Sequence, residues 1–73
     1  MPHSVHSLDA VRRIEAFMDA KGLTQTEFAI RAKTTDRTIR KIQKTALIKR
    51  TMLADIAEAM GITKEELLRE SES

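Results

Sequence analysis

Basic side chains are concentrated in the middle of this chain. The stretch AKTTDRTIRKIQK, residues 32–44, carries five Lys or Arg, one Asp and two isoleucines. Residues 31–50 hold eight Lys or Arg against one Asp, a charge of +7, while the remainder holds five against ten, a charge of −5. Such a block of one sign indicates either an ordinary solvated face or a binding surface for a polyanion.

No group of residues points to catalysis or to a metal. His3 and His6 have a spacing that metal ligands can have, but no third ligand is near them, so we expect both to be solvated. Cysteine is absent, which excludes disulfides and thiolate metal sites. Ser, Thr, Asp and Glu are plentiful, but none is paired with a His in a catalytic pattern. We therefore expect a protein that is not an enzyme and needs no cofactor.

Length and hydropathy limit the remaining possibilities. A chain of 73 residues forms one domain with a small core. No apolar run approaches the roughly 18 residues of a membrane span, and the start, MPHSVHS, lacks the apolar segment of a signal peptide. We expect a cytoplasmic protein with no membrane partner. Two Phe and no Trp or Tyr offer little for stacking on single-stranded bases.

The sequence pattern predicts helices throughout. Apolar residues at Leu8, Val11, Ile14 and Met18 follow the helical period, and Gly22 ends that helix. The segments GLTQTEF and GITKEEL each have a Thr followed three residues later by a Glu, which is the capping-box signature of a helix start. Two more helices are expected over 35–43 and 51–60, and no stretch alternates long enough to predict a strand. The predicted fold is all-α, a compact five-helix domain.

The second and third helices position the basic residues. The second, 24–32, and the third, starting near residue 35, are joined by two residues, and so short a connection fixes helices at a steep angle. Because residues three and four apart share a face, burial of Ile39 and Ile42 turns the charged residues outward. These are Asp36, Arg37, Arg40, Lys41 and Lys44.

Residues 24–44, TQTEFAIRAKTTDRTIRKIQK, resemble the helix-turn-helix of the Cro and phage-repressor family of bacterial and phage transcription regulators. The matching features are Gln25 opening the second helix, Ala29 at the tight helix contact, and Ile39 and Ile42 in the core of the recognition helix. LADIAEAMGITKEELL resembles the family's fourth and fifth helices. The resemblance implies a lambda-repressor-like DNA-binding domain over 8–70, and we expect a mobile N-terminal tail at 1–7 and a C-terminal tail at 71–73.

The chain departs from the family pattern at three places. Lys33 stands where the family usually has Gly, so a left-handed backbone there costs about 1 kcal/mol that Gly avoids. Met18 and Gln43 stand where many relatives pair an Arg with a Glu. The loop after the recognition helix, usually polar, contains Leu47 and Ile48.

The resemblance also implies contact roles. The predicted base-reading residues are Thr35, Asp36, Arg37, Arg40 and Lys41. The predicted phosphate contacts are Gln25, Lys33, Thr34, Lys44, Lys49 and Arg50. Arg and Lys favour guanine, Asp can accept from cytosine, and a Thr methyl can meet thymine. The alternative for each of these residues is an ordinary solvated position, and an Asp in the first turn also simply stabilises a helix.

These observations predict a sequence-specific transcriptional regulator, expected to be a repressor, that binds double-stranded DNA by inserting helix 35–43 into the major groove. A homodimer on a near-palindromic operator is expected, either already in solution or only on DNA, with an interface from Leu47, Ile48 and Leu68. The alternative for the loop is that one of its two apolar residues anchors inward. The family implies a bacterial or phage-encoded protein that is associated with the nucleoid when bound. Two alternatives stay open: an antitoxin that autoregulates its operon beside a toxin partner, and a small helical module whose basic face meets an acidic protein.

Overall fold

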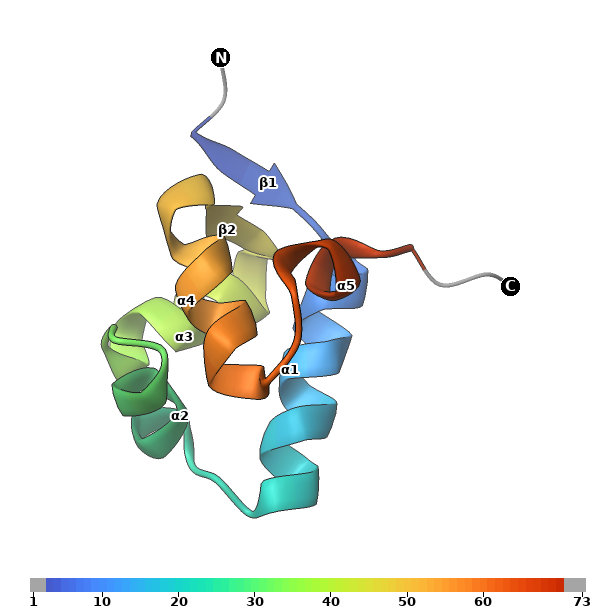
Figure 1. The fold of residues 1–73 in the computed structure, drawn as a ribbon. Coiled ribbons are helices and arrows are strands. Elements are labelled where there is room, and N and C mark those ends of the chain that lie inside the picture. The colour runs from blue at the N-terminus through green and yellow to red at the C-terminus, as the bar shows by residue number, and fades with distance from the viewer. Residues whose placement is uncertain (1–2, 71–73) are drawn as a thin grey trace.

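Residues 3–70, the part of the chain that the computed structural model describes, fold into five helices and two short strands (Figure 1). In chain order the elements are β1 (Ser4–His6), α1 (Leu8–Lys21), α2 (Gln25–Arg31), α3 (Asp36–Thr45), β2 (Leu47–Lys49), α4 (Arg50–Met60) and α5 (Lys64–Leu68). The five predicted helices are therefore present, each within a few residues of its expected bounds. The tail expected at 71–73 lies outside the described residues.

Local hydrogen bonds explain where the helices start and stop. The Thr24 hydroxyl accepts from the Glu27 N–H at 3.1 Å, and the Glu27 carboxylate accepts from the Thr24 N–H at 2.9 Å, which completes the predicted capping box. At α5 the Thr63 hydroxyl accepts from the backbone N–H three residues later. Gly22 and Gly61 end α1 and α4 with left-handed backbones, at φ 64° and 73°.

The capping box makes the stability of α2 depend on pH. The hydrogen bonds from the Thr24 backbone N–H and hydroxyl hold the pKa of Glu27 below its ordinary value of 4.5. Since the folded-state pKa is the lower one, the cap stabilises the fold fully above the unfolded-state value. That contribution is lost as pH falls from 4.5 through the lowered folded-state pKa.

We expect Glu27→Gln to flatten the dependence of the thermal midpoint on pH below about 4.5, because the amide does not titrate. The measurement is a series of circular-dichroism melts between pH 6 and pH 2.5, roughly the range in which carboxylates titrate. Glu15→Gln, which removes an exposed carboxylate from the middle of α1, is the control. Equal slopes for Glu27→Gln and the wild type would refute the assignment.

The two strands correct the sequence-based expectation. β1 pairs antiparallel with β2, and the register places Val5 opposite Ile48. The expected mobile tail over 1–7 is thus wrong for Ser4–His6, which belong to the folded domain. Each strand has three residues, so the alternation of exposed Leu47, buried Ile48 and exposed Lys49 is too short to stand out in the sequence.

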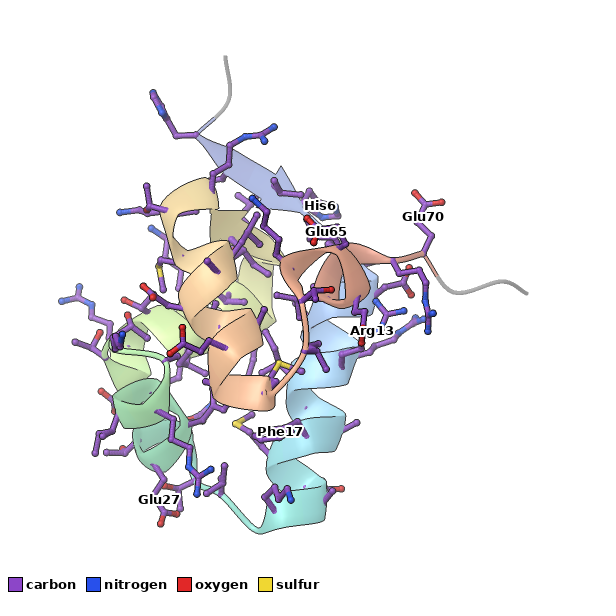
Figure 2. All side chains as sticks on the ribbon, viewed as in Figure 1. His6, Arg13, Phe17, Glu27, Glu65 and Glu70 are labelled. Carbon is purple, nitrogen blue, oxygen red and sulfur yellow. The ribbon has the colours of Figure 1, made fainter. Side chains whose placement is uncertain are left out.

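The core is apolar, and every helix and β2 contribute fully buried side chains to it, whereas β1 contributes only the partly buried Val5. Its largest fully buried side chains are Phe28, Ile14, Ile39, Ile48, Ile56 and Leu67. The Phe17 ring, labelled in Figure 2, meets the Phe28 ring edge-on, with centroids 6.0 Å apart, and joins α1 to α2. About one turn earlier in α1, the Arg13 Nη1 donates to the Leu67 carbonyl oxygen at 2.9 Å and ties α5 to α1.

α2 packs chiefly on α3, and α5 packs on both α4 and α1 (Figure 1). The radius of gyration, 11.1 Å, agrees with the roughly 11 Å expected for a compact domain of this length. Within residues 3–70, no helix is both long and apolar enough to cross a membrane.

Candidate functional site

The outer face of α3 carries several exposed basic side chains. Ile39 is fully buried and Ile42 nearly so, and both point from α3 into the core. The opposite side of the helix is exposed, and its basic residues are Arg37, Arg40, Lys41 and Lys44. The sequence-based prediction of inward isoleucines and an outward basic face is confirmed.

A tight turn holds α3 against α2. The Thr34 N–H donates to the Ala29 carbonyl at 2.9 Å, and Lys33 has a left-handed backbone with φ 58°. Ala29 and Ala32 are buried, and their small side chains let α2 and α3 approach each other closely. Lys33 therefore bears the cost of a left-handed backbone that a glycine would avoid, and the turn fixes the direction in which α3 presents its outer face.

We expect Lys33→Gly to raise the free energy of unfolding by about 0.5 to 1 kcal/mol, because glycine adopts a left-handed backbone without steric cost. Lys33→Ala is the matched control, since it removes the same ammonium group but keeps the Cβ and its strain. Urea denaturation of the three proteins measures the difference. Equal stabilities of the Gly and Ala variants would contradict the strain argument.

Four polar side chains are connected in a row along one edge of α3, in the order Gln43, Gln25, Arg40 and Asp36. The Gln25 Nε2 donates to the Gln43 Oε1, and the Gln25 Oε1 accepts from the Arg40 Nε at 2.9 Å. The Arg40 Nη2 also lies 3.5 Å from the Asp36 Oδ2. Gln25 and Gln43 are half-buried, whereas 65% of the Arg40 side chain remains exposed. The exposed guanidinium of Arg40 is therefore held in place by the half-buried amides of Gln25 and Gln43.

The structure brings some of the predicted site residues together around a groove beside α3. The groove has a volume of about 350 Å³, and Thr34, Lys41 and Lys49 contribute to its wall. Leu47 also lines it, with 46% of its surface exposed. Three of the predicted contacts from separate parts of the chain thus share one surface.

The remaining predicted DNA contacts are not among the residues that line this groove. Thr35 is exposed and caps α3, since its hydroxyl accepts from the Thr38 N–H at 3.3 Å. Asp36 is in the first turn of α3 and Lys44 in the last. Arg50 is exposed at the first residue of α4, where its N–H donates to the His3 carbonyl at 2.9 Å.

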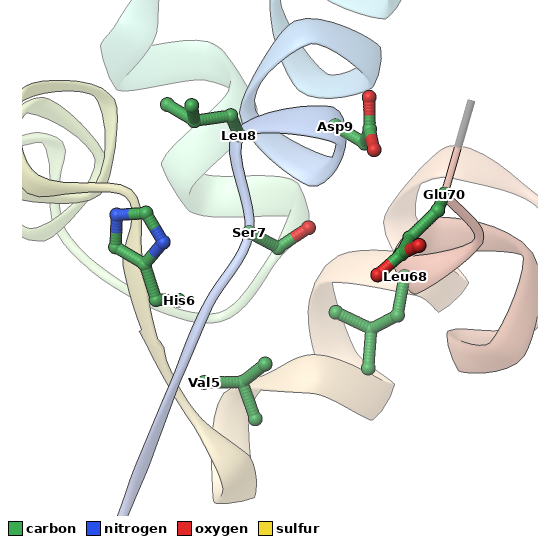
Figure 3. A pocket seen from close by; sticks show the side chains of 7 residues that line it. All are labelled: Val5, His6, Ser7, Leu8, Asp9, Leu68 and Glu70. Atoms are coloured by element: carbon green, nitrogen blue, oxygen red, sulfur yellow. The ribbon is translucent and has the colours of Figure 1, made fainter. Parts of the chain in front are cut away.

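The predicted dimer interface is only partly compatible with the structure. Ile48 is fully buried, so its assignment to an interface between two copies is wrong. The strand pairing explains this, because it turns Ile48 inward and leaves its neighbour Leu47 outward. Leu68 is half-buried and lines a different groove, to which Leu8 and Glu70 also contribute (Figure 3).

Sequence reasoning missed the part that Gln43 plays. The resemblance marked this position only as a missing charge, although a glutamine on the flank of an otherwise apolar helix face is a signal that a polar partner is near.

Within residues 3–70, no three His, Cys, Asp or Glu side chains are grouped as metal ligands would be. No protein-family model and no curated protein matches the sequence.

Proposed function

We propose that this protein binds double-stranded DNA sequence-specifically and regulates transcription. In this proposal α2, the turn and α3 act as a helix-turn-helix, and α3 enters the major groove. The observation that carries it is the exposed basic face of α3, held in a fixed direction by the turn and by two buried isoleucines. An α-helix with its side chains is about 10 to 12 Å across, which suits a major groove about 12 Å wide.

The proposed contacts fall into two groups. Thr35, Asp36, Arg37, Arg40 and Lys41 meet base edges, and the Arg and Lys side chains favour guanine. The phosphate contacts come from Gln25, Lys33, Thr34, Lys44, Lys49 and Arg50, which position the protein without reading sequence. The shared groove wall of Thr34, Lys41 and Lys49 supports one continuous surface for both groups.

Salt dependence tests the electrostatic part of the proposal. Four of the proposed phosphate contacts are cationic, so binding to random duplex DNA should follow a slope of log K against log salt near −4 per protein copy. Fluorescence anisotropy between about 50 and 200 mM salt measures this slope. Affinity that did not change with salt would leave the basic face without a polyanionic partner and favour the interaction-module alternative.

Selection of bound sequences from random duplexes tests sequence specificity. A single enriched motif is expected, and its symmetry would report the proposed two-fold dimer, with half-sites about 34 to 36 Å apart. Repression is the proposed outcome at such an operator, and autoregulation beside a toxin is its variant. Enrichment of no motif would refute specific recognition.

Leu47 and Leu68 are the interface candidates that the fold leaves open for the proposed dimer. We expect Leu47→Asp, a change at an exposed position, to fold normally and to lose cooperative binding to the selected site. Stoichiometry on that site, measured by ultracentrifugation, decides the question. Unchanged cooperativity in Leu47→Asp would remove this residue from the interface.

A further inference from the structure

The amides of Gln25 and Gln43 form a hydrogen-bonded link between α2 and α3 that also reaches Arg40. Eighteen residues separate them in the sequence, and the Gln25 side chain bridges from Gln43 on one side to Arg40 on the other. Arg40 is exposed, yet its Nε has a defined acceptor 2.9 Å away. An exposed arginine without such an acceptor samples many rotamers, so this contact restricts where the guanidinium lies.

The donor and acceptor atoms of Arg40, Gln25 and Gln43 allow these two hydrogen bonds to form in only one orientation of the Gln25 amide. The Arg40 Nε–H can only donate, so the Gln25 end that faces it must be the amide oxygen. The Gln25 NH₂ group then faces Gln43, where it needs an acceptor, and the Gln43 Oε1 supplies one. If the Gln25 amide were turned over, its NH₂ would meet the Arg40 donor. Gln43 therefore holds the Gln25 oxygen toward Arg40.

The ion pair with Asp36 does not replace this contact. The Arg40 Nη2 lies 3.5 Å from the Asp36 Oδ2, and both side chains are substantially exposed, at 65% and 41%. Exposed pairs of this kind contribute little and are weakened by salt. The neutral amide contact from Gln25, in contrast, is anchored by a half-buried residue and is insensitive to charge screening.

We propose that Gln43 is a positioning residue for base recognition: through Gln25 it orients the Arg40 guanidinium before DNA arrives, so the base preference at Arg40 depends on a side chain that does not touch DNA. This inference rests on the proposed function. Preorganisation of this kind lowers the entropic cost of forming the contact with the base. Gln25 itself still contacts only phosphate in this proposal, but because it holds Arg40, its replacement is expected to alter base preference indirectly as well as to weaken binding to every sequence.

The first test uses the free protein, so it does not depend on DNA binding. Arginine Nε–H groups give resolved signals in proton–nitrogen NMR spectra, and Arg40→Lys identifies the Arg40 signal by its loss. We expect Gln43→Met, which keeps length but removes the acceptor, to shift this signal and speed its exchange with water. Gln43→Glu keeps an acceptor and should retain the signal. A folded Gln43→Met protein with an unchanged Arg40 signal would overturn the positioning role.

The second test is a double-mutant cycle on the selected operator and on its single base-pair variants. Gln43→Met should reduce discrimination about 2- to 10-fold at the base pair that Arg40→Ala also relaxes, the range expected for one hydrogen bond. It should leave binding to random duplex nearly unchanged, and it should have no further effect in the Arg40→Ala background. Additive effects of the two substitutions would overturn the inference.

The two tests separate failure of this inference from failure of the proposed function. If the Arg40 signal responds to Gln43→Met but the protein binds no duplex DNA, the proposed function and the proposed role in base recognition are both wrong. The hydrogen bonds that link Gln43, Gln25 and Arg40 are confirmed in that case. If DNA is bound specifically but the cycle is additive, only the role of Gln43 is wrong. Backbone NMR spectra of each variant check that the fold is retained.

Discussion

Ile48→Asp is expected to leave the protein unfolded at 25 °C. The side chain is fully buried, and it forms the inward-facing residue of β2 opposite Val5. The substitution removes the burial of a large apolar side chain, about 1.5 to 3 kcal/mol, and adds the several kcal/mol needed to bury or protonate an unpaired carboxylate. A domain of 73 residues is stable by only about 4 to 11 kcal/mol.

Leu47→Asp is the matched control for this prediction, because it places the same carboxylate one residue earlier at a position 46% exposed. We expect that variant to keep its helical circular-dichroism spectrum and to unfold within about 1 kcal/mol of the wild type. Guanidinium denaturation of both variants supplies the measurement. A folded, cooperatively unfolding Ile48→Asp protein would show that the strand pairing does not bury this side chain.

The second large effect is expected on DNA. Replacement of both Arg37 and Lys41 by Ala should weaken binding to the selected operator by about 2 to 6 kcal/mol, since each base contact contributes about 1 to 3 kcal/mol. Both residues are exposed on α3, so the fold should be unaffected. Binding to random duplex should weaken much less, because phosphate contacts dominate there. Anisotropy titrations on the two DNAs at equal salt measure the difference.

The control for this double variant removes the same two residue types from α1. Arg12 and Lys21 are exposed there, so Arg12→Ala with Lys21→Ala has the same net charge as the double variant on α3. If the α1 variant lost operator binding equally, net charge alone would explain the effect. If the α3 variant weakened operator and random duplex by the same factor, Arg37 and Lys41 would be phosphate contacts.

Much of the helical framework could be predicted because its signals are local. A Thr hydroxyl caps the N–H three residues later, as Thr24 and Thr63 do, and a glycine ends a helix through its own backbone freedom, as Gly22 does. The inward direction of Ile39 and Ile42 likewise follows from the helical period. The strands escaped prediction because three residues carry too little periodicity to distinguish a strand from a loop.

The sequence by itself determined the helices, their caps and the outward direction of the basic residues on α3, since these depend on neighbours within about four positions. Only the tertiary structure decided that Ile48 is buried, because that required Val5 to pair with it from the far end of the chain. The same holds for Gln43, whose oxygen acquires its role when α2 brings Gln25 beside it. A hydrogen bond or a buried contact between remote residues exists only once folding has closed the chain between them, and no local pattern records that closure.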